Sequence, residues 1–213
     1  MTDRQDSLSS LDTFPKLLLD HGVNRPARVA LREKDLGIWL TWTWSEVVGN
    51  VRALACGLAS FGFERGDKVA IVGDNRPELY MAMMAIQSLG GVPVPVYQDS
   101  VAEEMQYVLE HAEVKFAIVE DQEQTDKILP VKDRCPNLTG VLYSDPRGMR
   151  HYRQDDLFAY TEIQARGREF DKANPDYYLD EVTKGKGEDI GVFLYTSGTT
   201  GRPKGVMLSY DNV

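Results

Sequence analysis

The sequence contains few of the residues that form disulfides or bind metals, with two cysteines and three histidines among 213 residues. Cys56 and Cys135 lie far apart and form no CxxC pair, which predicts reduced structural thiols in a reducing compartment. His21, His111 and His151 have no partner at metal-ligand spacing, and two of them close predicted helices. We therefore expect capping or surface roles for the histidines and no metal site.

The chain also lacks a basic charge balance and an uninterrupted apolar span. Its formal net charge of −9 argues against a general nucleic-acid-binding protein, which needs a basic face. The start, MTDRQDSLSS, has no apolar segment typical of a secretory signal. Residues 79–98 carry no charge, but Gly90-Gly91 and the prolines after them predict a helix, a turn and a strand instead of a membrane span. We expect a soluble, cytoplasmic protein.

Short apolar runs alternate with helical patterns along most of the chain. Runs of five or six apolar residues predict strands, and the segments between them predict helices. The expected strands are 68–73, 92–96, 115–120, 140–144 and 190–195, and the helices between them are 75–90, 100–111 and 122–134. This order is typical of an α/β fold with a mostly parallel sheet flanked by helices on both faces. We expect one domain over 1–213.

The part of the chain before this series predicts a helix at 12–21 that stops at Gly22, followed by a hairpin of strands at 28–34 and 38–43. Three tryptophans, Trp39, Trp42 and Trp44, are expected to pack at this hairpin and not to form a lipid site. The predicted helix caps are Thr43 with Glu46, Asn75, and Ser100 with Glu103.

Two further regions depart from the alternation. The prolines of 92–96 predict a strand at the edge of the sheet. Residues 145–190 are more charged and show helical pieces at 154–172 and 175–184 without a clear strand.

Residues 196–205, TSGTTGRPKG, are built to hold an anion. Glycines at 198, 201 and 205 permit positive φ and let backbone N–H groups form an anion-binding nest. Hydroxyl groups and Lys204 add donors and positive charge for a polyphosphate. A solvated linker is the alternative, but this segment is held between the apolar strand 190–195 and the apolar residues 206–208.

Two better-known motifs do not fit this segment. The P-loop pattern ends in Gly-Lys-Ser/Thr and runs directly into a helix, whereas here Pro203-Lys204-Gly205 precedes a short strand, and a helix start appears only at Ser209. The GxSxG elbow of serine hydrolases fails because Tyr195-Thr196 precedes Ser197.

The run YTSGTTGRPKGV resembles the signature phosphate loop of the adenylate-forming enzymes: acyl-CoA synthetases, peptide-synthetase adenylation domains and luciferases. TWTWSEV, GDKVAIVGDNRPELY, QSLGGVPVPVYQDS and HAEVKFAIVED are similar to the amino-terminal part of the family. The longer run YLDEVTKGKGEDIGVFLYTSGTTGRPKGVMLS looks most like bacterial long-chain fatty acyl-CoA synthetases, and the resemblance covers about residues 12–213.

The resemblance implies that ATP with Mg²⁺ activates a long-chain fatty acid to an acyl-adenylate, and that CoA then takes the acyl group as a thioester. It also leaves open a peripheral contact with membranes. The phosphate contacts that it implies are Thr196, Ser197, Gly198, Thr199, Thr200, Gly201 and Lys204.

Complete members of that family continue for several hundred residues, with the acyl pocket, the Mg²⁺-binding acidic residue and the catalytic lysine in later segments. We therefore expect 1–213 to be the N-terminal part of the adenylate-forming domain, inactive alone, with its catalytic residues unknown. Whether the chain is itself an enzyme stays open. The alternative is a non-catalytic module that binds nucleotide or docks onto a partner. Exposed core surface predicts self-association.

Overall fold

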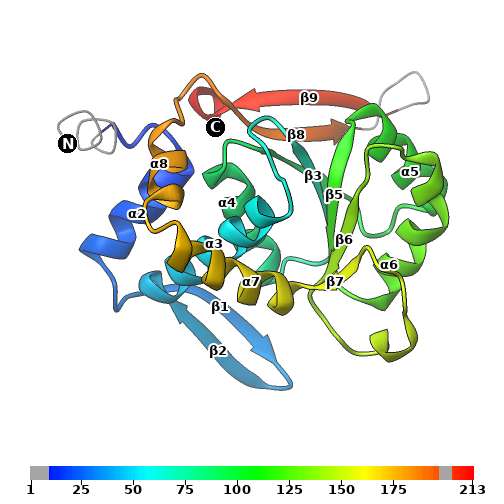
Figure 1. The fold of residues 1–213 in the computed structure, drawn as a ribbon, viewed down its shortest axis with the longest axis horizontal. Coiled ribbons are helices and arrows are strands. Elements are labelled where there is room, and N and C mark those ends of the chain that lie inside the picture. Colours follow the sequence, from blue (N-terminus) through cyan, green and yellow to red (C-terminus); the bar gives the residue numbers. More distant parts are fainter. Residues whose placement is uncertain (1–9, 197–202) are drawn as a thin grey trace.

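The computed structural model describes residues 10–196 and 203–213. Its centre is a sheet of five parallel strands in the order β4-β3-β5-β6-β7 (Figure 1). The strands are β3 (Lys68–Val72), β4 (Val92–Val96), β5 (Val114–Val119), β6 (Gly140–Tyr143) and β7 (Leu157–Ala159). The predicted α/β class with a parallel sheet is confirmed, and β4 is an edge strand of that sheet, as its prolines predicted.

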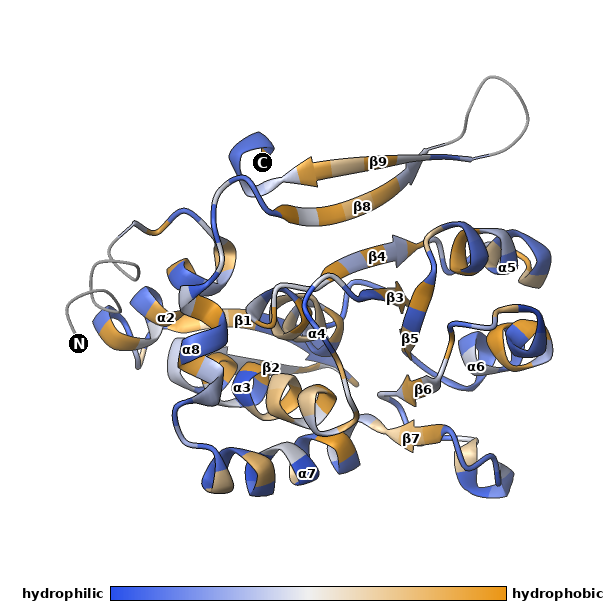
Figure 2. Ribbon diagram, turned by 45° about the horizontal axis from the view of Figure 1, so that its top comes forward, coloured by the Kyte–Doolittle hydropathy of each residue, from blue (hydrophilic) through white to orange (hydrophobic). Residues whose placement is uncertain are grey.

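Alternate residues of the sheet face two separate apolar cores. In β3, Val69 and Ile71 face one core, whereas Ala70 and Val72 face the other, because successive side chains of a strand point to opposite faces. Both faces are therefore covered by helices, as in other parallel sheets (Figures 1 and 2).

The helices divide between these two faces. The first core is formed with α2 (Phe14–Asn24), α3 (Trp44–Ser60), α4 (Pro77–Ser88), α7 (Tyr160–Ala173) and α8 (Tyr177–Thr183). The second is formed with α5 (Ala102–His111), α6 (Gln122–Ile128) and the 3₁₀ turn η1 (Leu129–Arg134). Two shorter 3₁₀ turns are η2 (Met149–His151) and η3 (Tyr210–Asn212).

Two antiparallel hairpins flank the central sheet. The first, of β1 (Val29–Asp35) and β2 (Ile38–Thr43), is the predicted one. It leads into α3 through the predicted capping box, in which the Glu46 amide donates to Thr43 Oγ1 at 3.3 Å and the Thr43 amide to Glu46 Oε2 at 2.7 Å. Trp39 remains 63% exposed, so the expectation that it packs is wrong. Trp42 and Trp44 do pack against the first core.

The second hairpin joins β8 (Ile190–Thr196) to β9 (Lys204–Ser209). It lies along the outer side of β4 without joining the ladder of the five-stranded sheet (Figure 2). Pro93 and Pro95 of β4 have no N–H to donate, which is consistent with a ladder that stops there. Ser209 caps η3 in a box with Asn212, as expected of a helix start.

Several local predictions were wrong. Helix α2 continues past Gly22 to Asn24. The N-caps of α4 and α5 are Arg76 and Val101, and neither helix has a side-chain cap, so Asn75 and Ser100 do not take the predicted roles. Strand β7 lies within 145–190, where no strand was expected, because its three half-buried residues give only a weak pattern.

The uncharged segment 79–98 consists of most of α4, a turn and β4, as predicted. In the part of the chain that the structure describes, no helix is both long and apolar enough to cross a membrane. Cys56 and Cys135 are buried free thiols, in agreement with the sequence.

Candidate functional site

The β8–β9 hairpin presents the two ends of the predicted phosphate loop. Thr196 at the end of β8 is the direct cross-strand partner of Lys204 at the start of β9. Both residues are exposed, so the hydroxyl and the ammonium group are accessible to a ligand. Antiparallel pairing places opposed residues about 5 Å apart, and this brings the first and last predicted contacts together.

The remaining predicted contacts are Ser197, Gly198, Thr199, Thr200 and Gly201, and they lie outside the described residues. Their roles stay predictions. The structure does describe β8 and β9, the two strands on either side of these residues.

Gly205 has a different role from the one expected. It is absent from the glycines with positive φ, so it does not supply a left-handed turn. A Cβ atom there would lie 2.2 Å from Cε2 of Phe193, which belongs to the neighbouring strand. The small residue therefore allows the Phe193 ring to cover the hairpin backbone.

Helix α5 holds the base of the loop through two side chains on one helical face. The hydroxyl of Tyr195, which is only 9% exposed, lies 2.6 Å from Nδ1 of His111. Tyr107, one helical turn before His111, donates its hydroxyl to the carbonyl of Pro203 at 3.2 Å. The Tyr107 and His111 rings stack with centroids 5.5 Å apart. Both ends of the loop are thus fixed to the same helix.

Burial, with a smaller contribution from Tyr107, raises the pKa of the Tyr195 hydroxyl to about 12. The hydroxyl therefore stays protonated at neutral pH and remains a neutral hydrogen-bonding group. The hydrogen bonds of Tyr107 and His111 to the hairpin were not predicted from the sequence. The i, i+4 spacing of Tyr107 and His111 was visible, but their partners lie 84 or more residues away along the chain.

A cavity of about 400 Å³ adjoins the loop base. It lies between the ends of β3 and β4 and the last residues of β8, and its walls are Gly73, Asp74, Asn75, Pro95, Val96, Tyr97, Gln98, Asp99, Leu194 and Tyr195. In open α/β sheets, ligands bind outside the carboxyl ends of the strands. This cavity has that location, and Tyr195, the residue before Thr196, forms part of its wall.

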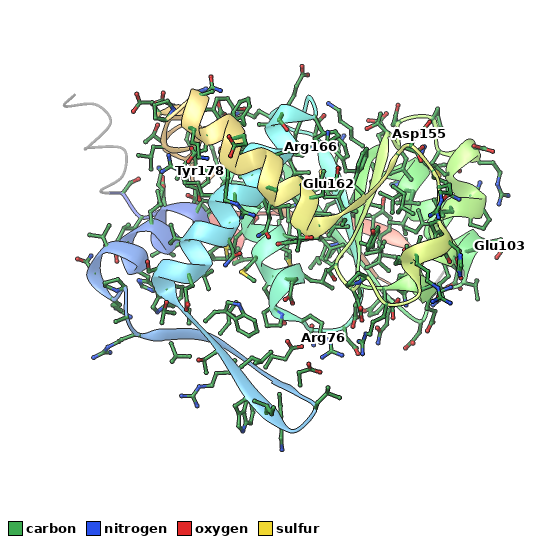
Figure 3. The ribbon with its side chains drawn as sticks, turned by 60° about the horizontal axis from the view of Figure 1, so that its bottom comes forward. Arg76, Glu103, Asp155, Glu162, Arg166 and Tyr178 are labelled. Carbon is green, nitrogen blue, oxygen red and sulfur yellow. The ribbon has the colours of Figure 1, made fainter. Side chains whose placement is uncertain are left out.

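A second polar cavity, of about 440 Å³, lies at the carboxyl ends of β3, β5 and β6. An ion-pair network occupies one wall. Arg76, labelled in Figure 3, binds Glu33 of β1 through Nη1 at 2.6 Å and Glu120 through Nε at 3.0 Å. The second oxygen of Glu120 accepts the Asp74 amide at 2.6 Å. These bonds raise the pKa of Arg76 and attach the β1–β2 hairpin to the sheet, which is a structural role.

Comparison with known proteins matches residues 19–213 to the family described as AMP-binding enzyme. A long-chain-fatty-acid–CoA ligase of Xenopus laevis is 34% identical over 187 residues, which are 87% of this chain and 24% of that protein. A long-chain-fatty-acid–CoA ligase of Mycobacterium bovis is 29% identical over 202 residues, which are 95% of this chain and 32% of that protein.

Solved structures show the same fold. An anthranilate CoA ligase in complex with anthranoyl-AMP matches with a TM-score of 0.73 at 20% identity, over 92% of this chain and 34% of that one. VinN in complex with L-aspartate matches with a TM-score of 0.67 at 22% identity, over 93% of this chain and 44% of that one. The chain thus spans about a quarter to a third of the length of the curated relatives named above.

Proposed function

The chain belongs to the family of AMP-binding enzymes, and we propose that it supplies the ATP-phosphate loop of a long-chain fatty acid–CoA ligase. In this proposal residues 1–213 are the N-terminal part of the adenylate-forming domain. The complete enzyme joins a fatty acid carboxylate to the α-phosphate of ATP, releases pyrophosphate, and passes the acyl group to CoA.

One observation carries the proposal. The β8–β9 hairpin pairs Thr196 with Lys204 and anchors both neighbouring residues, Tyr195 and Pro203, to α5. A segment of hydroxyl residues and glycines that is held at both ends has less conformational entropy to lose when it closes around phosphate oxygens than a free linker has. The names of the relatives support the choice of fatty acid and CoA as substrates.

In this proposal Mg²⁺ binds together with the phosphates of ATP. Among residues 10–196 and 203–213, no group of three or more His, Cys, Asp or Glu side chains is placed to hold a metal ion. The residues of this chain therefore do not form a metal site of their own in that part, and we derive no step through the metal. A cytoplasmic location with peripheral contact to membranes is part of the same proposal.

The loop assignment is tested by titrating the chain with pyrophosphate while following backbone amide NMR signals of 196–205. We expect these signals to shift and Lys204→Ala to weaken binding about 10- to 100-fold, because a hydrogen bond to a charged group contributes about 1.5–3 kcal/mol. Lys172→Ala is the control, since Lys172 is exposed on α7. Equal affinities for the two variants, or no shifts in 196–205, would contradict the assignment.

The chain alone is predicted to be inactive in adenylation. The check is ATP–pyrophosphate exchange in the presence of a long-chain fatty acid, with the chain at micromolar concentration. Exchange above the protein-free background would show that residues 1–213 contain a working catalytic site. The alternative function, a nucleotide-binding or partner-docking module, predicts pyrophosphate binding without exchange even in the complete natural protein.

A further inference from the structure

The β1–β2 hairpin projects from the body of the fold and carries apolar side chains at its free end (Figures 1 and 3). Leu36 in the turn is 90% exposed, Ile38 is 66% exposed and Trp39 is 63% exposed. A single exposed apolar residue is ordinary, but three within four successive positions form a patch at one end of the molecule. None of the predicted phosphate contacts belongs to this patch.

Leu36 has a backbone conformation that leucine rarely adopts. Its φ is +46° and that of Gly37 is +84°, so both central residues of this two-residue turn have positive φ. Such turns favour Asn, Asp or Gly at the first position, because a bulky side chain is strained there. Leu36 is almost fully exposed, so packing within the described chain does not offset the strain. The turn is suited to present an apolar side chain to a partner.

One face of the hairpin is turned toward the body of the fold. Leu31 and Trp42 are direct cross-strand partners and pack against the first core. Glu33 lies two positions after Leu31 and hence on the same face, and it binds Arg76 at 2.6 Å. Asp35, two positions further, borders the polar cavity that also contains Arg76. Both carboxylates of the hairpin therefore lie on its inner face.

The opposite face of the hairpin carries cations. Arg32 and Lys34 alternate with the inner-face residues, so they point to solvent, and both are exposed. Neither forms an ion pair with another residue of 10–196 or 203–213. Lys34 Nζ lies 6.0 Å from the ring centroid of its cross-strand partner Trp39. Residues 25–43 contain four basic and two acidic side chains, a net charge of +2 in a chain of −9.

We propose that the free end of the β1–β2 hairpin inserts into the surface of an anionic lipid bilayer. Leu36 and Ile38 enter the apolar layer, and Trp39 lies with Lys34 at the level of the headgroups, where tryptophan is enriched. Arg32 lies about 13 Å behind Leu36 along the strand, at about 3.3 Å per residue, and contacts lipid phosphates. The inference rests on the membrane contact of the proposed function, and it does not depend on the phosphate loop.

A second copy of the chain fits this surface less well than a bilayer does. A symmetric contact would place Arg32 and Lys34 against the same residues of the other copy, and like charges across an interface oppose association. A bilayer that contains anionic lipids offers the complementary charge. The charge of the outer face therefore selects the bilayer.

Co-sedimentation with vesicles measures the binding, with pure phosphatidylcholine compared with a mixture that contains about 30% phosphatidylglycerol. We expect the chain to bind the anionic vesicles at least about fivefold more tightly than the neutral ones. The binding should weaken when the salt concentration rises from about 0.1 M to about 0.5 M. Anionic vesicles should also shift the tryptophan emission to the blue, and Trp39→Phe should remove this shift although Trp42 and Trp44 remain.

Leu36→Asn tests the tip of the hairpin, because asparagine adopts positive φ more readily than leucine. The variant should weaken vesicle binding about tenfold or more, since it removes one buried apolar side chain from the contact. Its melting temperature should be equal or higher, whereas a leucine required for the fold would lower it on replacement. Val101→Asn makes the same change at a 56% exposed position before α5 and should leave vesicle binding unchanged.

The double variant Arg32→Gln, Lys34→Gln tests the cations. It should weaken binding to anionic vesicles about 25-fold, which corresponds to about fivefold for each cation near the bilayer surface. The control is Arg168→Gln with Lys172→Gln, which removes the same charge from exposed positions of α7 and should leave the binding nearly unchanged.

The proposal is overturned if the chain does not bind anionic vesicles, if it binds neutral vesicles equally well, or if the hairpin variants behave like their controls. It is also overturned if Leu36→Asn shifts sedimentation toward the monomer without lipid, since a second copy is then the partner. Pyrophosphate titration separates this result from the proposed function. Leu36→Asn should keep the pyrophosphate affinity of the unchanged chain, so that either assignment can fail while the other stands.

Discussion

Gly57 of α3 and Gly167 of α7 meet so closely that a Cβ atom on Gly167 would lie 2.5 Å from the backbone nitrogen of Gly57. The same atom would lie 1.8 Å from the carbonyl oxygen of Ala53. The two helices thus touch through their backbones. Beside this contact, Arg52 forms two parallel bonds of 2.8 Å to the carboxylate of Asp171. The crossing of α3 and α7 is one of the most tightly specified contacts of the fold.

Gly167→Ala is expected to lower the free energy of unfolding by about 1–3 kcal/mol or more, because the new methyl group meets backbone atoms that have no alternative position. Urea denaturation monitored by circular dichroism measures this change. Gly49→Ala is the control, since it lies on α3 with nothing within 4 Å of the added atom. That variant should gain up to about 1 kcal/mol of stability from the higher helix propensity of alanine. Equal losses in both variants would contradict the close contact.

Glu78, in the first turn of α4, is expected to make stability fall as the pH rises. Burial is the main reason that its pKa is raised above the model-peptide value of 4.5, with further contributions from Glu33 and Glu120. The folded chain therefore holds the Glu78 proton more tightly than the unfolded chain does. This contribution to stability is fully present below about pH 4.5 and is lost as the pH rises through the folded-state pKa.

Glu78→Gln should accordingly melt at a higher temperature than the unchanged chain near pH 8, and the difference should vanish near pH 4. Calorimetry at the two pH values gives the comparison. Glu103→Gln, at an exposed position in the first turn of α5, repeats the charge change at a helix start without the burial. A gain for Glu78→Gln that is the same at both pH values would show that the carboxylate is not the cause.

Tyr195→Phe removes one of the two bonds that hold the loop base to α5 and leaves the ring packing in place. We expect a loss of about 0.5–1.5 kcal/mol in the free energy of unfolding, the usual contribution of one hydrogen bond. We also expect weaker pyrophosphate binding, because the loop ends are less well positioned. Tyr152→Phe is the control, since the Tyr152 hydroxyl bonds Asp126 of α6 and not the hairpin. A loss of stability with unchanged pyrophosphate affinity would limit the role of Tyr195 to the fold.

The sequence was most informative where a single residue type decides the local structure. The apolar runs of β3, β5 and β6 predicted the buried sheet, and Pro93 and Pro95 predicted its edge. Prediction from the sequence failed where two neighbouring residues could each be the N-cap of a helix. Asn75 was the expected cap of α4, but its side chain accepts the Tyr80 hydroxyl at 3.1 Å, and Arg76 is the N-cap.

The features that could not be predicted from the sequence depend on contacts between distant segments of the chain. The hydrogen bond of His111 to Tyr195 joins residues 84 positions apart, and no local pattern indicates it. The same holds for Thr13 Oγ1 and Gln87 Oε1, which are buried without a hydrogen-bond partner among residues 10–196 and 203–213, because this depends on how α2 and α4 pack. The residues that carry the proposed chemistry were visible in the sequence, whereas the side chains that position them were not.

Self-association is expected through β9, the outer strand of the β8–β9 hairpin, because it is β8 that packs along β4. Met207 is 63% exposed and Val206 41% exposed, and Figure 2 shows apolar residues along both strands. An exposed apolar strand is a template for pairing with another copy of the chain. Met207→Glu should therefore shift sedimentation-velocity profiles toward the monomer, because a charge on this strand opposes burial. Leu36→Glu, at the 90% exposed tip of the other hairpin, is the matched control and should leave the profile unchanged. If both variants behave alike, or if the unchanged chain is monomeric at high concentration, this surface does not drive association.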